Sequence, residues 1–167
     1  MRPGDPGPLM TFAVAPTSLA IRVITGIVLV ANAGLFAAAA CGYPLWPAAL
    51  ILLLLVAACW VFWAPVAYET DGRTLVVRFR VGRVRYGPVT RAAAVAERLS
   101  GVIRLFGNGG LFAGCGIFWS RAHGLFRAYV TRSAPRDLVL VEAGGRKVFV
   151  SPADPAALRT ALSPPPR

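Results

Sequence analysis

The chain has 167 residues, 56% of them hydrophobic, and a formal net charge of +11. The positive charge favours anionic partners, namely phospholipid headgroups, nucleic acid or an acidic protein surface. The three cysteines show no CxxC or Cys/His spacing, which excludes a zinc site and a disulfide-stapled scaffold, and no metal or other cofactor is expected.

Residues 1–18 contain four prolines and two glycines without hydrophobic periodicity, which predicts a disordered N-terminal tail. Two uncharged runs follow, at residues 23–40 and 45–67, with only four residues between them. Crossing a bilayer takes about 20 apolar helical residues. The sequence therefore predicts a transmembrane hairpin over residues 19–67, with helices at about 19–40 and 45–67.

Asn32 lies in the middle of the first predicted helix, where an unpaired amide would be costly. We expect it to bond to the second helix or to a second copy of the protein. Gly34 and the alanines near it are expected to allow close helix packing. A transport role is not expected, because the hairpin has no second polar group to form a relay.

Arginine placement predicts the orientation of the hairpin. The turn between the helices is uncharged, whereas Arg2 and Arg22 flank the first helix and five arginines closely follow the second. By the positive-inside rule, both chain ends then face the cytoplasm.

We predict one small domain over residues 68–163. A C-terminal tail is predicted at residues 164–167. Turn residues separate strand-length apolar segments, and a short helix ends the domain. The predicted strands are at 66–70, 74–81, 84–86, 89–98, 103–106, 116–120, 126–131, 137–142 and 147–151. Ser151–Asp154 matches a capping box, which predicts that Ser151 caps a helix whose first residue is Pro152, with Leu158 and Leu162 on its apolar side.

Two turns of the domain carry specific expectations. Gly82 and Arg83 fit a two-residue type II′ turn, and this register places Arg80 opposite Arg85. Like charges at that position destabilise a sheet unless an anion lies near. A second, glycine-rich bend is predicted at residues 106–114. Its shape is expected to depend on Gly107, Asn108, Gly109 and Gly110. It lacks the Gly-Lys-Ser/Thr ending of a P-loop, so a phosphate cradle is not expected.

Four blocks of the domain form a recognisable set, namely Arg104–Phe112 (RLFGNGGLF), Gly116–Trp119 (GIFW), Phe126–Thr131 (FRAYVT) and Val148–Pro155. Together they resemble the bacterial pleckstrin-homology (PH)-like domains, and the resemblance covers about residues 66–162. The resemblance implies a membrane-anchored α+β protein, with the hairpin followed by a PH-like antiparallel β-barrel or sandwich that the C-terminal helix caps. It also implies a bacterial inner membrane.

The arginines after the hairpin are the strongest candidates for binding. They are Arg73, Arg78, Arg80, Arg83 and Arg85. In PH domains a basic strand pair holds phosphoinositides, and Arg73 with Arg78-x-Arg80 loosely resembles it; bacteria generally lack those lipids, so that ligand does not carry over. We expect contact with anionic phospholipid headgroups or a protein partner. The alternative is that these arginines only set the topology.

No catalytic site is predicted. His123, the only histidine, lies in a loop without a nucleophile elbow, and the carboxylates fall in separate elements. Nucleic acid is not an expected partner, since the arginine strands lack outward aromatic side chains for base stacking.

The sequence therefore predicts a non-enzymatic membrane protein that presents a PH-like domain to the cytoplasm as a binding or scaffolding module. An alternative is an accessory subunit of a larger membrane complex, docked through the hairpin.

Overall fold

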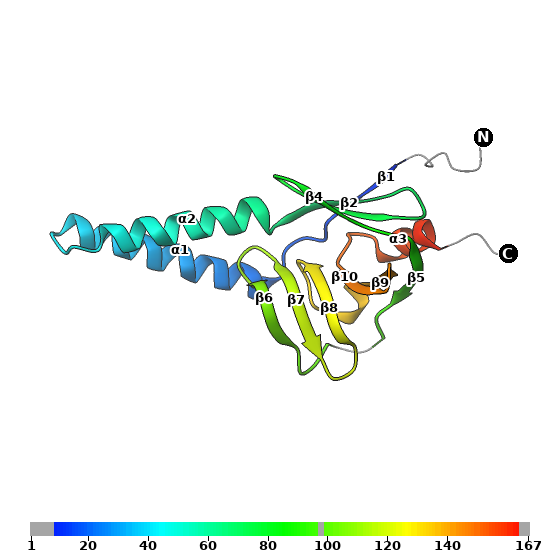
Figure 1. Ribbon diagram of the computed structural model, residues 1–167. Helices are drawn as coiled ribbons and strands as arrows, with labels where there is room; N and C mark the ends of the chain where they lie inside the picture. Colours follow the sequence, from blue (N-terminus) through cyan, green and yellow to red (C-terminus); the bar gives the residue numbers. More distant parts are fainter. Residues whose placement is uncertain (1–8, 97–98, 164–167) are drawn as a thin grey trace.

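The computed structural model describes residues 9–96 and 99–163. Two antiparallel helices, α1 (Leu19–Ala40) and α2 (Trp46–Phe62), form a hairpin that projects from a two-sheet domain (Figure 1). The turn between the helices lies at the end of the hairpin that is far from the domain.

The first helix is long and apolar enough to cross a membrane. It has 22 residues. Its most apolar stretch of 18 residues has a mean hydropathy of 2.1, and only 6% of that stretch is buried. Ser18 caps its start, because its hydroxyl accepts a hydrogen bond from the backbone N–H of Ile21. Among the described helices it alone reaches this length and hydropathy.

The second helix is shorter than predicted. It has 17 residues, about 25 Å at 1.5 Å per residue, and ends at Phe62 instead of residue 67. Pro65 explains the early end, because proline disfavours helical geometry in the residue before it and lacks the N–H that a helix needs. Strand β2 (Pro65–Thr70) begins there.

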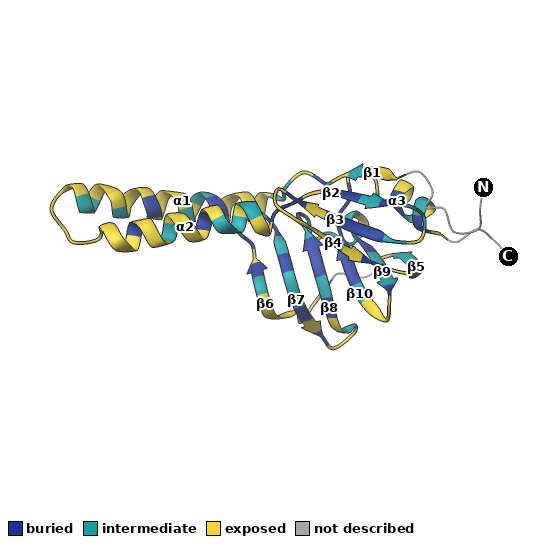
Figure 2. Cartoon of the chain, turned by 45° about the horizontal axis from the view of Figure 1, so that its top comes forward, coloured by how far each residue is buried: buried dark blue, intermediate teal, exposed yellow. Residues whose placement is uncertain are grey.

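The surface of the hairpin is largely apolar and exposed (Figure 2). The two helices bury only Thr25, Asn32, Ala49 and Val56. An exposed apolar surface of this extent is typical of contact with lipid or with another protein.

The first sheet has the strand order β1-β2-β3-β4, with β1 at Met10–Ala13, β3 at Leu75–Phe79 and β4 at Arg83–Tyr86. Met10–Ala13 pair antiparallel with Thr70–Ala67. The prediction of a disordered tail is therefore wrong for β1, whose backbone satisfies the otherwise open edge of β2. Residues 1–8 of the predicted tail lie outside the described residues.

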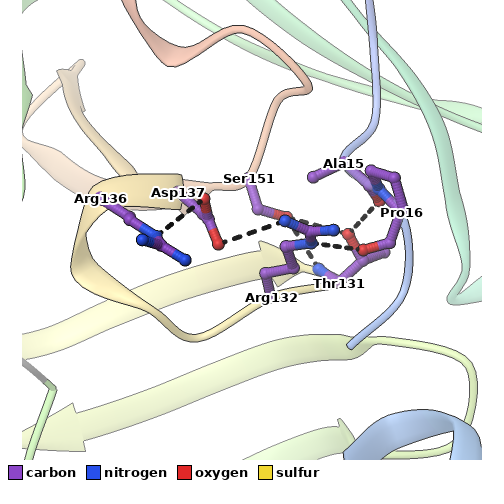
Figure 3. Close-up of polar contacts among 7 residues, drawn as sticks. All are labelled: Ala15, Pro16, Thr131, Arg132, Arg136, Asp137 and Ser151. Atoms are coloured by element: carbon purple, nitrogen blue, oxygen red, sulfur yellow. Dashed lines mark hydrogen bonds and ion pairs between the residues drawn. The ribbon is translucent and has the colours of Figure 1, made fainter. Parts of the chain in front are cut away.

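The segment between β1 and α1 is bound to the domain by a compact set of hydrogen bonds (Figure 3). The hydroxyl of Thr131 donates to the carbonyl of Ala15 at 2.6 Å, and the N–H of Thr131 donates to the hydroxyl of Ser151 at 2.8 Å. Arg132 Nε donates to the carbonyl of Pro16 at 2.8 Å. We call residues 14–18 the strap, since they fix the start of α1 against the domain.

Replacing Thr131 with the isosteric valine should lower the free energy of unfolding by about 1–3 kcal/mol, because the buried Ala15 carbonyl and Ser151 hydroxyl would both lose a partner. Denaturant unfolding of the full chain in detergent measures this. Thr90→Val is the control, since Thr90 makes one exposed hydrogen bond, to Glu142. Equal effects of the two substitutions would show that the strap contacts contribute little.

The second sheet has the order β5-β9-β10-β8-β7-β6. Its strands are β5 (Val89–Ala94), β6 (Ile103–Gly109), β7 (Gly114–Ser120), β8 (Gly124–Val130), β9 (Val139–Ala143) and β10 (Arg146–Val150). The strand predicted at 89–98 ends at Ala94, and residues 97–98 lie outside the described residues.

The predicted antiparallel barrel or sandwich needs two corrections. The sheets do not close into a barrel, and β8 pairs parallel with β10. The connection after β8 contains a short 3-10 helix, η1 (Pro135–Asp137), and β9 then takes the place between β5 and β10. This crossover leaves β8 and β10 side by side and running in the same direction.

The main core lies between the sheets and the C-terminal helix α3 (Pro155–Leu162). Leu158 and Leu162 are fully buried, as expected for its apolar side. The predicted cap at Ser151 and helix start at Pro152 are wrong. Asp154 is the cap, accepting hydrogen bonds from the N–H groups of Ala156 and Ala157, while Ser151 is buried and bonded to Thr131.

The β3–β4 register differs from the prediction. Arg78 lies opposite Arg83, and Val76 opposite Arg85, so the turn between the strands is at residues 80–82. The predicted pairing of Arg80 with Arg85 is wrong, because Arg80 leaves the sheet to contact Trp60 in α2.

The glycine-rich segment is mostly strand. Gly107, Asn108 and Gly109 belong to β6, and only Gly110 lies in the turn before β7, so the predicted bend is confined to residues 110–113. Asn108 shapes that turn, since its side-chain oxygen accepts hydrogen bonds from the N–H groups of Gly110 and Leu111.

Candidate functional site

The structure separates the five candidate arginines into two groups. Strand β3 has five residues, about 16 Å at 3.3 Å per residue, with Arg73 before its start and Arg80 after its end. Arg85 pairs near the start of β3, and Arg83 pairs near its end. Arg73 and Arg85 are therefore the distal arginines, far from the hairpin. Arg78, Arg80 and Arg83 are the proximal arginines, near the end of α2.

Acidic residues offset part of this charge. Arg78 forms an ion pair with Glu69 at 2.8 Å, and Arg85 lies 4.0 Å from Asp71. Partial burial acts to raise the pKa of Asp71, but hydrogen bonds from the N–H groups of Arg73 and Thr74 outweigh it and lower the pKa. Asp71 thus stays ionised at neutral pH beside the distal arginines and offsets part of their charge, as Glu69 does for Arg78.

Arg80 connects the domain to the hairpin. Its guanidinium carbon lies 3.9 Å from the centre of the Trp60 ring, and its Nη1 donates to the Trp60 carbonyl at 3.1 Å. A cation is favourable here, at the carboxyl end of α2, and over an aromatic face. The contact holds the β3–β4 turn at the base of the hairpin. In the part of the chain that the structure describes, neither Arg80 nor Arg83 has a carboxylate within 4.0 Å.

A cavity of about 460 Å³ lies at the junction of hairpin and domain. We call it the junction cavity. One wall is the strap, and the others come from α1, from the end of α2 and from the β3–β4 and β6–β7 turns. Arg22 and Arg80 both line it, and Phe112 closes one side, with its N–H donating to the hydroxyl of Thr25 in α1.

A second groove, of about 380 Å³, opens between the two sheets beside the end of α2. Phe62 and Trp63 form its rim, and Arg83 and Arg127 supply its positive charge. Its floor is rigid, because Arg127 donates to the Tyr86 hydroxyl at 3.1 Å and that hydroxyl lies 2.6 Å from the hydroxyl of Tyr129. Burial and the hydrogen bond with Tyr86 raise the pKa of Tyr129, so Tyr129 stays protonated.

Asn32 and Gly34, the candidates for helix packing, behave differently. Asn32 is buried and donates to the Ala49 carbonyl in α2 at 3.0 Å, one of the two alternatives that the sequence left open. Gly34 is exposed, and a Cβ there would meet no atom within 4 Å, so it does not pack against α2. Because the amide is satisfied within the chain, it does not require a partner helix.

Replacing Asn32 with alanine should weaken the hairpin by about 1 kcal/mol, the usual size of a side-chain hydrogen bond between membrane helices. The loss of helicity during unfolding in detergent micelles measures it. Ala33→Ser is a control at the next, exposed position and should change little. A stability equal to that of the unchanged chain would contradict a packing role for Asn32.

His123 and Asp137 make separate contacts, away from each other's side chains. The His123 ring packs edge-on against Phe149, with 5.2 Å between ring centres, and Asp137 pairs with Arg132 at 3.6 Å. Within residues 9–96 and 99–163, no three His, Cys, Asp or Glu side chains gather in a way that could hold a metal ion.

The sandwich with a helix at its C-terminal end, and with arginines on its first hairpin, is the arrangement of a PH-like domain. Such domains are generally non-catalytic binding modules. The bacterial PH domain family model matches residues 66–164, and the chain belongs to that family. Searches of curated proteins and of solved structures gave no match.

Neither β1 nor the strap lies within the residues that the family model matches. The sequence signals for these two elements were weak, because four residues of alternating pattern after a proline-rich segment do not distinguish a strand from a tail. The junction cavity was therefore not predictable as a site, although both of its arginines are visible in the sequence.

Proposed function

We propose that the protein is a non-enzymatic binding module that the helix hairpin anchors in a bacterial inner membrane, with both chain ends in the cytoplasm. Its proposed ligand is the headgroup layer of anionic phospholipid, contacted by the proximal arginines. The distal arginines are not part of this proposal.

The position of Arg80 carries the proposal. Its contacts with Trp60 hold the β3–β4 turn at the end of α2, which is the level of the headgroups if the hairpin spans the membrane. Trp60 and Trp63 support this level, because tryptophan is enriched at membrane interfaces. The 17 uncharged residues of α2 are at the short end of the range for a span.

Lipid selection by the full chain tests the proposal. The protein is extracted into polymer discs from membranes that contain equal amounts of phosphatidylglycerol and phosphatidylcholine, and the lipids retained are measured by mass spectrometry. Enrichment of phosphatidylglycerol is expected. In the double variant R78Q/R83Q this enrichment should fall several-fold, because each arginine near an anionic surface contributes about 1 kcal/mol to binding.

The distal double variant R73Q/R85Q is the matched control, with the same change of charge. Its enrichment should fall less than that of R78Q/R83Q, because Arg73 and Arg85 lie towards the end of β3 that is farther from the hairpin, and so farther from the headgroups. Equal losses in the two variants, or no enrichment at all, would refute the proposal and favour a purely topological role for the arginines.

A further inference from the structure

We propose that the junction cavity holds one anionic phospholipid, whose phosphate lies between Arg22 and Arg80 and whose acyl chains follow α1 towards the membrane interior. This inference deepens the proposed function and rests on its premise that the hairpin lies in a membrane. It adds a defined site to what is otherwise a surface attraction.

The α1 wall of the cavity changes from charged to apolar along the helix, as a phospholipid changes from headgroup to acyl chain. Arg22, Thr25, Gly26 and Leu29 line it, and their spacing of three, four and seven residues places them on one face of the helix. The face is about 10 Å long at 1.5 Å per residue. It passes from a charged residue near the domain to an apolar one deeper in the helix, in the direction in which a phospholipid passes from phosphate to acyl chain.

The charge of the cavity suits a phosphate. Arg22 is the only charged residue in α1, and no Asp or Glu is among the residues that line the cavity. Arg80 is held in place by Trp60, so it is preorganised for an anion. The amino end of α1 lies beside the cavity, since Pro16 and Thr17 of the strap also line it, and the helix dipole there favours negative charge.

The size and lining of the cavity favour a lipid over a free anion. About 460 Å³ is in the usual range for a small-molecule site and much larger than a phosphate ion needs. Leu29, Trp60 and Phe112 make much of the wall apolar. Gly26 keeps the α1 side open, because a Cβ at that position would meet no atom within 4 Å.

Two matched substitutions test the assignment. Gly26→Leu places a side chain in the cavity, whereas Gly34→Leu places the same side chain on an exposed part of the same helix. Neither glycine has a positive φ angle, so both variants should fold, which thermal unfolding in detergent checks. Arg22→Gln removes one charge from the cavity without touching any of the proximal arginines.

The measurement is native mass spectrometry of the delipidated full chain, titrated with phosphatidylglycerol, phosphatidylcholine or glycerol 3-phosphate. One phosphatidylglycerol should bind at least tenfold more tightly than phosphatidylcholine. Gly26→Leu should abolish that tight binding and Arg22→Gln should weaken it about tenfold, with Gly34→Leu unchanged. Glycerol 3-phosphate should not compete at concentrations at which the lipid saturates the site.

Each contrary result has a distinct meaning. Tight binding that survives Gly26→Leu would overturn the cavity assignment, whether or not the proximal arginines enrich anionic lipid. Competition by glycerol 3-phosphate at similar concentrations would show a site for a free anion instead of a lipid. Enrichment that R78Q/R83Q abolishes, together with no saturable single lipid, would refute the cavity site and leave the proposed function standing.

Discussion

Replacing Gly116 with alanine is expected to lower the free energy of unfolding by about 3 kcal/mol or more. Gly116 in β7 pairs with Gly107 in β6, and the two backbones approach so closely that a Cβ on Gly116 would lie 2.1 Å from the Phe106 carbonyl oxygen. The φ angle of Gly116 is +149°, which side-chain-bearing residues rarely adopt. Strained backbone alone costs about 1–3 kcal/mol, and the clash adds to it.

Denaturant unfolding of the full chain measures this effect, and Gly124→Ala separates its two causes. Gly124 also has a positive φ angle, +67°, but a Cβ there would meet nothing within 4 Å. Replacing Gly124 with alanine should lower the free energy of unfolding by about 1 kcal/mol, which is the cost of the left-handed backbone conformation alone. Similar losses for both variants would show that the close approach of β6 and β7 does not constrain the sheet.

Truncating Phe149 to alanine should cost about 3–5 kcal/mol, as is usual for a fully buried phenylalanine. Its side chain lies on the face of the second sheet opposite the main core, in a cluster with Phe118, Phe126 and Ala128. The Phe126 ring packs edge-on against it with 4.8 Å between ring centres. Removing Phe149 therefore leaves a cavity that the rigid sheet cannot close.

The control for Phe149 is Leu125→Ala, also in the second sheet. Leu125 is 62% exposed, so its truncation should change stability by no more than about 0.5 kcal/mol. Thermal unfolding of both variants compares them directly. A small loss for Phe149→Ala would mean that this cluster is not a second core, and that α3 and the space between the sheets carry the stability of the domain.

The site proposals depend on how the hairpin meets the domain. Three independent contacts fix that junction, namely the strap on Thr131, Arg80 on Trp60, and the N–H of Phe112 on Thr25. A domain held in this way cannot swing freely relative to the hairpin. With the hairpin in a membrane, as proposed, its binding surfaces are confined to one distance from the bilayer, which suits the proposed contact with headgroups.

Much of the architecture was predictable from local pattern. Uncharged runs of residues predicted the two helices, alternating segments predicted most strands, and Leu158 and Leu162 predicted the buried side of the last helix. The family resemblance was visible in the blocks around Arg104–Phe112 and Phe126–Thr131, and the match over residues 66–164 confirms it. These features depend on hydrophobic periodicity and turn residues, which act over a few residues of chain.

The sequence by itself determined the apolar hairpin, the small β domain after it, and the concentration of arginine where they join. Only the tertiary structure decided which arginines lie together, because Glu69 and Asp71 offset some of them and Trp60 draws Arg80 out of the sheet. It also decided that residues 10–13 form a strand and that the strap walls a cavity. Hydrogen bonds such as that from Thr131 to Ala15, 116 residues apart, depend on the folded chain as a whole, and no local pattern encodes them.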